Sequence, residues 1–325
     1  MGMLDDSNAN RDPNRYPWVD PMKKAMWHGF WTVEKFPFDS DLRDFHITMT
    51  PEQKQLVVRA LACVAQIEVK VKTYWAMLGL HVKDPIIVGG GIVMAGVEEI
   101  HNDAYEQLLK KLNMLDTLRE VLEVPAINAR VGYLTKHTLP IYGKDPKKQF
   151  AYSLGLFTMF VEYVSLFNAF YAILYLNREH NILKDTSQQV KYTRNEETIH
   201  AQFGMNIIAE LRREYPEIFD AELEGRFYEE ARVAVECEDR LIDWMLESFD
   251  EPACNPALLK SYTRVRMNEA LDGLGYKAIF SVPDTDIEAT NWMKVGVLAP
   301  AKVDFFHGES TAYVQGDRPD DDDDF

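Results

Sequence analysis

Apolar and polar residues recur at helical spacing over most of the 325-residue chain, and the two-residue alternation of a strand is scarce. The clearest helix spans residues 50–80, where Thr50 provides an N-cap and Pro51 takes the first helical position. A second helix covers residues 92–113, and three glycines at 89–91 leave its start open. Further helices are predicted over residues 117–137, 147–178, 185–214, 221–248 and 255–273. The pattern predicts an all-α fold.

The predicted helices follow one another without an internal repeat and without a linker rich in glycine or serine. We therefore expect one helical domain over residues 46–281, preceded by an N-terminal arm at 1–45. The C-terminal segment, 282–325, ends in the sequence GDRPDDDDDF, whose composition is typical of disordered acidic tails. Its terminal Phe325 is an unusual residue to leave in water.

The composition limits the cellular compartment and the classes of partner that the protein can have. The formal charge of −17 argues against nucleic acid or an anionic membrane as a partner. Three cysteines without metal or redox spacing indicate a reducing cytoplasm, and no basic, apolar leader opens the chain. We expect a cytoplasmic protein that does not rely on disulfides.

The predicted helix at 147–178 is so apolar that Glu162 is its only charged residue between Gln149 and Asn177. A membrane span would fit this length, but the segment also carries several tyrosines, serines and an asparagine, which favour a buried helix. An ionised carboxylate there must be paired, protonated or bound to metal. Glu162 is therefore either a satisfied core carboxylate or a ligand.

The same situation recurs at Glu68, which is the only acid between Glu52 and Asp84. In addition, VEEIHNDAYEQLL at 97–109 and RNEETIH at 194–200 each contain Glu-x-x-His, which places Glu and His on one helix face. Two such motifs plus two isolated glutamates form the ligand set of a ferritin-like, dimetal-carboxylate four-helix bundle. The predicted ligands are Glu68, Glu98, His101, Glu162, Glu197 and His200.

Charge balance supports this ligand set. Four carboxylates and two neutral imidazoles carry about −4, which two divalent cations neutralise inside an apolar bundle. Glu99 and Glu196 stand two and four residues from the histidines, so we assign them outside the ligand set. Such a bundle can store iron, oxidise a bound substrate or generate a radical.

Over residues 16–316 the chain resembles the radical-generating small subunit of class I ribonucleotide reductase. The resemblance rests on VEEIHNDAYEQLL, RNEETIH, the FW at 30–31, RVRMNEALDGLGY at 264–276 and ESTAYVQG at 309–316. It implies that Tyr105 occupies the position of the stable tyrosyl radical and that Trp31 passes the oxidising equivalent outward. Trp18 and Trp27 are rivals for that second role. The structural alternatives are that Tyr105 is a packed core residue and that Trp31 anchors the N-terminal arm.

The resemblance also implies that Tyr313 relays the radical to a large, catalytic subunit, on which the acidic C-terminal tail docks. Relatives carry Asp at the position of Glu196, where it links a metal-bound histidine to the tryptophan. The longer side chain leaves that role open. Family members are homodimers, and a homodimer is expected here.

Two departures bear on the metal. Most tyrosyl-radical members have Asp as the first ligand where this chain has Glu68, and Lys72 follows one turn later. Lys72 is either a hydrogen-bond donor to a ligand or a surface lysine. Together with a retained Tyr105, these features resemble subclass d, whose dimanganese centre holds the oxidising equivalent. A dimanganese centre is therefore favoured over diiron or mixed manganese and iron beside a tyrosyl radical.

The expected function is oxidant generation for the reduction of ribonucleotides to deoxyribonucleotides by the large subunit. A ligand-binding dimetal oxidase of the same superfamily would share the six ligands without needing ESTAYVQG. A ferritin-like storage protein is the non-enzymatic alternative.

Overall fold

The computed structural model describes all residues except 1, 6–9, 116–119, 122 and 295–325, and within helices it leaves out the side chains of 66 and 68–71. Within the described ranges the fold is helical, and sheet pairing is limited to one isolated bridge between Glu251 and Cys254. The three cysteines are buried and unpaired. The all-α prediction is confirmed.

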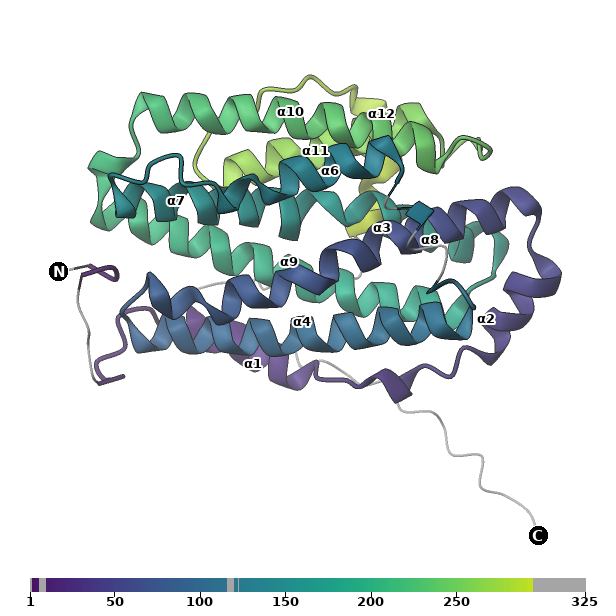
Figure 1. Cartoon of the computed structure of the whole chain (residues 1–325), viewed down its shortest axis with the longest axis horizontal. Coiled ribbons are helices and arrows are strands. Elements are labelled where there is room, and N and C mark those ends of the chain that lie inside the picture. The colour runs from purple at the N-terminus through teal and green to yellow at the C-terminus, as the bar shows by residue number, and fades with distance from the viewer. Residues whose placement is uncertain (1, 6–9, 116–119, 122, 295–325) are drawn as a thin grey trace, which may run out of the picture.

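The long helices form a bundle with a second layer over it (Figure 1). Helices α3 (Pro51–Ala76) and α4 (Pro85–Lys111) lie side by side, α9 (Lys184–Glu214) contacts α4, and α8 (Phe167–His180) contacts both α3 and α9. Helices α6 (Pro125–Leu134), α10 (Ala221–Met245) and α11 (Pro256–Gly273) form the adjoining layer. Shorter helices also occur: α2 (Asp39–Arg43), α7 (Pro146–Leu156), α12 (Asp284–Thr290), Val33–Lys35, Asp44–Thr48, Leu78–Leu80, Thr135–Thr138, Pro216–Ile218 and Asn291–Lys294.

The start of α3 follows the predicted capping. The Thr50 hydroxyl accepts from the Gln53 backbone N–H, and the Gln53 side chain accepts from the Thr50 N–H, so the two form a capping box. Asp84 caps α4 in a similar way by accepting from the Ile86 N–H.

The three glycines at 89–91 lie inside α4 and do not break it. A Cβ on Gly91 would stand 2.9 Å from the Trp75 carbonyl oxygen, and a Cβ on Gly90 would stand 2.6 Å from the Phe203 ring. These glycines therefore let α4 approach its neighbours closely.

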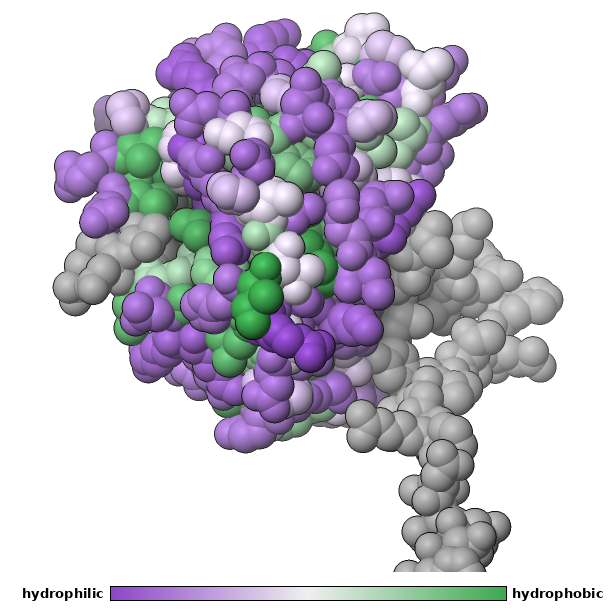
Figure 2. Space-filling view, turned by 90° about the vertical axis from the view of Figure 1, so that its right-hand side faces the viewer, coloured by the Kyte–Doolittle hydropathy of each residue, from purple (hydrophilic) through white to green (hydrophobic). Residues whose placement is uncertain are grey.

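The segment predicted as one helix at 147–178 consists of two α-helices, α7 and α8, joined by a π-helix at Phe157–Ser165. It is long and apolar enough to span a membrane, but 94% of its most apolar stretch is buried inside the protein. On the face drawn in Figure 2, hydrophilic residues predominate and apolar ones form small patches. The run from α7 to α8 is a core segment of the bundle.

Both ends of the described chain pack on the bundle. Helix α1 (Val19–His28) contacts α4 and α9. Helix α12 packs on α11, and the buried side chain of Met293 follows it. Arg194 of α9 donates to the Met293 carbonyl oxygen at 3.1 Å, so the C-terminal segment is anchored up to this point. The predicted tail, with Phe325, lies outside the described residues.

Candidate metal centre

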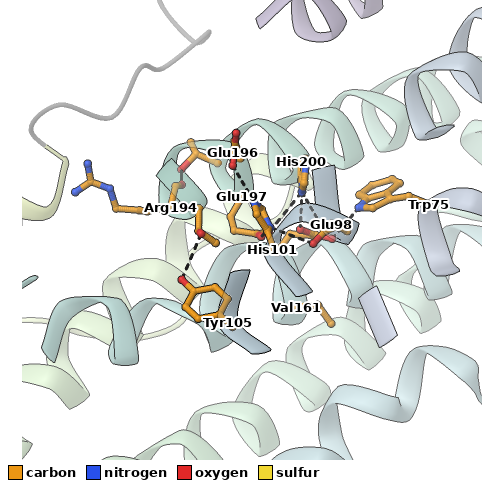
Figure 3. Close-up of polar contacts among 12 residues, drawn as sticks. Trp75, Glu98, His101, Tyr105, Val161, Arg194, Glu196, Glu197 and His200 are labelled. Atoms are coloured by element: carbon orange, nitrogen blue, oxygen red, sulfur yellow. Dashed lines mark hydrogen bonds and ion pairs between the residues drawn. The ribbon is translucent and has the colours of Figure 1, made fainter. Parts of the chain in front are cut away.

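Two helices bring the Glu-x-x-His pairs to the middle of the bundle. Glu98 and His101 of α4 are both fully buried, and so are Glu197 and His200 of α9. Because α4 and α9 pack on each other, the two motifs face one another (Figure 3). Glu162 joins them from the π-helix and has no exposed surface.

The ligand atoms of one histidine and three glutamates converge. One nitrogen or oxygen from each of Glu98, Glu162, Glu197 and His200 lies within 4.8 Å of the others. Nδ1 of His200 is 2.7 Å from Glu98 Oε1, 3.5 Å from Glu162 Oε2 and 3.6 Å from Glu197 Oε2. The side chains therefore surround a common point.

His101 adds its own Nδ1 to the same group of carboxylates. This nitrogen is 3.0 Å from Glu197 Oε1 and 3.3 Å from Glu98 Oε2. Its opposite nitrogen, Nε2, is 2.7 Å from Glu196 Oε2. A carboxylate behind the distal nitrogen is the usual arrangement of a metal-binding histidine, because it fixes the ring and its tautomer. Among the described residues, five predicted ligands thus share one site.

The chemistry of these atoms fits a bound cation. Both carboxylate oxygens of Glu98 and Glu197, Oε2 of Glu162 and both ring nitrogens of His200 are buried and make no aligned hydrogen bond with described residues. Buried polar atoms that lack such partners are costly unless another ligand satisfies them. Divalent cations between these atoms would satisfy them and balance their charge.

The ionisation of the metal-free site points the same way. Burial, with the nearby charges of Glu197 and Glu98, raises the pKa of Glu162 well above its ordinary value. Burial alone would lower the pKa of His200, but the Glu98 carboxylate and its neighbours outweigh burial and raise it well above its ordinary value. Burial would raise the pKa of Glu197, but the facing imidazoles lower it. Without metal, the site must therefore hold protons.

Glu196 connects the site to Trp31. Both oxygens of this carboxylate accept from the Trp31 indole N–H at 3.1 Å, while Oε2 also contacts His101. Trp31 is buried, and its ring centroid lies 6.3 Å from that of His101. The rivals lie elsewhere, since Trp18 packs on Phe203 and the side chain of Trp27 is 59% exposed.

Tyr105 lies one turn beyond His101 on α4 and is buried. Its hydroxyl donates to Thr193 Oγ1 at 3.3 Å. Lys72 forms an ion pair with Glu99, and both side chains are partly solvent-exposed, at 30% and 54%. No contact described for Lys72 joins it to the cluster, and the placement is that of a surface lysine. Of the remaining predicted residues, Tyr313 and the side chain of Glu68 lie outside the described part.

Trp75 is a site residue that the sequence reasoning did not identify. Its indole N–H donates to Glu162 Oε1 at 2.8 Å, and the side chain has no exposed surface. Trp75 follows Glu68 by seven residues on α3, which is close to two full turns of one helix face. That spacing was the available signal.

Comparison with known proteins gives concordant matches. The ribonucleotide reductase, small chain, family matches residues 9–287. "Probable ribonucleoside-diphosphate reductase small subunit 048L" of Invertebrate iridescent virus 3 is 26% identical, with 94% of this chain and 85% of the viral protein aligned.

Solved structures share the fold. The ribonucleotide reductase R2 subunit from Clostridium botulinum has a TM-score of 0.78 at 20% identity, over 89% of this chain and 93% of that one. Dimanganese(II)-NrdF from Streptococcus sanguinis has a TM-score of 0.73 at 16% identity, over 86% and 96%. The likeness extends over nearly the whole described helical fold.

Proposed function

The chain belongs to the ribonucleotide reductase small-chain family, and on that premise we propose that it generates the oxidant with which a large subunit reduces ribonucleotides to deoxyribonucleotides. The observation that carries this proposal is the convergence of three buried carboxylates with both imidazoles. Both oxygens of Glu98 and Glu197, Oε2 of Glu162 and both ring nitrogens of His200 make no aligned hydrogen bond with described residues, and Nδ1 of His101 lies 3.0 Å from Glu197 Oε1. Such a donor set serves cations and has no evident packing role.

The proposed centre is dinuclear. Glu98, His101, Glu162, Glu197 and His200 would hold it together with Glu68, which α3 carries on the same bundle. Two divalent cations would neutralise the four carboxylates. When bound, the metal pair supplies a one-electron oxidising equivalent after activation by an oxygen species.

Manganese is the metal we favour over iron or a mixed pair. The support is the glutamate at position 68, where tyrosyl-radical relatives carry aspartate, combined with the retained Tyr105. The fold is shared with a protein of S. sanguinis described as dimanganese(II), so it is compatible with this metal. Under this proposal Tyr105 stays unoxidised beside the centre, with its proton directed at Thr193 Oγ1.

The chain's own residues would conduct the oxidising equivalent outward. Glu196 accepts from the Trp31 N–H and contacts Nε2 of His101, so these three side chains form a continuous hydrogen-bonded path. The longer side chain of glutamate, compared with aspartate, spans the gap between the two rings. We propose that Trp31 passes the equivalent to Tyr313, whose segment lies outside the described residues.

The partners follow from the same proposal. The acidic tail that ends at Phe325 would dock on the large subunit, because a short acidic peptide with a terminal aromatic suits a partner's groove. The subunit itself would be a homodimer in the cytoplasm, with neither nucleic acid nor membrane as a partner.

Reconstitution tests this function. The manganese-loaded protein, mixed with a large subunit, a ribonucleoside diphosphate and a dithiol reductant, should form the deoxynucleotide, and neither subunit alone should. Absence of product with every class I large subunit tried would overturn the proposal. Electron paramagnetic resonance of the active protein decides the metal: a multiline manganese signal supports our assignment, and a narrow tyrosyl signal contradicts it.

A further inference from the structure

Glu162 differs from the other described ligands because it lies on a π-helix. The segment Phe157–Ser165 has π geometry between α7 and α8, whereas Glu98, His101, Glu197 and His200 lie on regular α-helices. A π turn takes one residue more than an α turn. Reversion to α geometry would therefore rotate Glu162 relative to one flanking helix by about 100°, the angle per residue of an α-helix. The π form sets the direction in which this carboxylate points.

At the C-terminal end of this segment, the backbone carbonyl oxygens of every second residue, three in all, accept hydrogen bonds from side chains. The Ser165 hydroxyl donates to the Val161 carbonyl oxygen at 3.2 Å. Arg266 donates to the Tyr163 carbonyl oxygen through Nε at 2.9 Å and through Nη2 at 2.6 Å. Arg130 donates to the carbonyl oxygen of Ser165. These bonds come from outside the backbone ladder and are made to the turn that carries Glu162.

Arg266 is held against the segment in a second way. Its guanidinium carbon lies 3.6 Å from the centroid of the Tyr163 ring and 3.5 Å from that of Phe167, so the group is packed against two rings of the π-to-α transition. The residue is 6% exposed. A planar guanidinium can stack on rings and at the same time direct two converging N–H bonds at one acceptor oxygen, which an ammonium group cannot do.

Arg130 links the segment to the helix that carries Glu68. It is fully buried on α6, and its Nη1 donates to the Cys63 carbonyl oxygen of α3 at 2.9 Å. Its Nε pairs with the buried Glu238 of α10 at 3.2 Å. One guanidinium therefore joins three elements around the π-helix and has its charge balanced.

We propose that Arg266 and Arg130 are positioning residues that keep segment 157–165 in its π form and so direct Glu162 toward the metal. The inference rests on the proposed function only in treating Glu162 as a ligand. Neither arginine contacts the described ligand side chains, so both act through the backbone.

The test uses Arg266→Lys, with Arg264→Lys as the matched control. Arg264 lies on the same helix, but its hydrogen bonds go to Asp239 of α10, at 2.9 and 2.7 Å, and to the Lys260 carbonyl oxygen of its own helix. Hydrogen exchange of the metal-free proteins measures how readily segment 157–165 opens. Mn(II) titration measures the affinity of the site to which Glu162 contributes. Arg266→Lys should exchange about tenfold faster within 157–165 and bind Mn(II) about tenfold more weakly. Arg264→Lys should match the wild type in both measurements.

A second variant guards against misfolding of the first. Arg130→Gln combined with Glu238→Gln removes both buried charges together, and it should also loosen 157–165 and weaken Mn(II) binding. Wild-type exchange in both variants, unchanged affinity despite faster exchange, or equal effects in Arg264→Lys would each overturn the proposal. If the wild-type protein bound no Mn(II), the metal centre itself would be refuted, and the positioning role with it.

Discussion

Replacing Glu162 by glutamine should stabilise the metal-free protein at alkaline pH and abolish its stabilisation by metal. The ligand atoms of Glu98, Glu162 and Glu197 lie within 4.8 Å of one another. Two unit charges at that distance repel by about 3.5 kcal/mol at an effective dielectric constant of about 20, so three ionised carboxylates would store about 10 kcal/mol. Because that is comparable to the whole stability of a typical domain, the metal-free site must keep protons.

The sign of the pH dependence follows from the pKa of Glu162, which the fold raises well above its ordinary value. Between the unfolded and the folded pKa the native state holds a proton that the unfolded chain has released. Stability is therefore full below the unfolded pKa and is lost as pH rises toward the folded pKa. His200, whose pKa is also raised, contributes with the same sign.

Between the unfolded and the folded pKa of Glu162, one such proton changes stability by about 1.4 kcal/mol per pH unit. An unfolding entropy of about 2.1 cal/mol/K per residue converts this into a fall in Tm of about 2 °C per pH unit for 325 residues. The glutamine in Glu162→Gln does not titrate, so the Tm of this variant should fall less than that of the wild type as the pH rises. Bound metal at about 100 times its Kd should add about 2.7 kcal/mol per site to the wild type and nothing comparable to the variant.

Thermal unfolding followed by circular dichroism, with and without Mn(II), measures both effects. Glu236→Gln is the control, because Glu236 is exposed on α10 and should leave the pH slope unchanged. A wild-type pH slope in Glu162→Gln, or an equal rise in the Tm of both proteins with Mn(II), would contradict the assignment of Glu162 as a protonated, metal-binding carboxyl.

Three further variants and a truncation give separate readouts. Trp31→Phe should keep metal binding and lose deoxynucleotide formation, and retained turnover would exclude Trp31 from the path. Glu196→Gln changes the group behind His101 Nε2 and should lower metal affinity about 10- to 100-fold in equilibrium dialysis. Glu238→Gln leaves a buried arginine uncompensated and should cost about 3–5 kcal/mol in denaturant unfolding; a cost under about 1 kcal/mol would contradict this. Truncation after residue 315 should abolish activity with the large subunit and leave metal loading intact; full activity would refute tail docking.

Much of the bundle could be predicted because its signals are local. The cap at Thr50 and the helical spacing of apolar residues fixed where α3 begins, and Glu-x-x-His fixed which faces of α4 and α9 turn inward. A glutamate isolated in an apolar segment identified Glu162 as a buried group in need of a partner. These inferences needed only helix geometry and the cost of burying charge.

What could not be predicted depends on contacts between distant segments. The glycines at 89–91 left the start of this helix open in the sequence, but in the structure they lie inside α4, where Gly90 and Gly91 let it pack closely on Phe203 and Trp75. The π-helix inside the apolar run has no compositional signal, since it is held by arginines that come from α6 and α11. Lys72 pairs with Glu99 instead of a ligand, and this choice depends on which way each side chain leaves its helix.

Anomalous scattering from a crystal of the manganese-loaded protein would locate the proposed dinuclear centre. We expect two manganese peaks per chain, enclosed by Glu98, His101, Glu162, Glu197 and His200, with Glu68 completing the set. A single peak, or manganese bound away from these side chains, would contradict it.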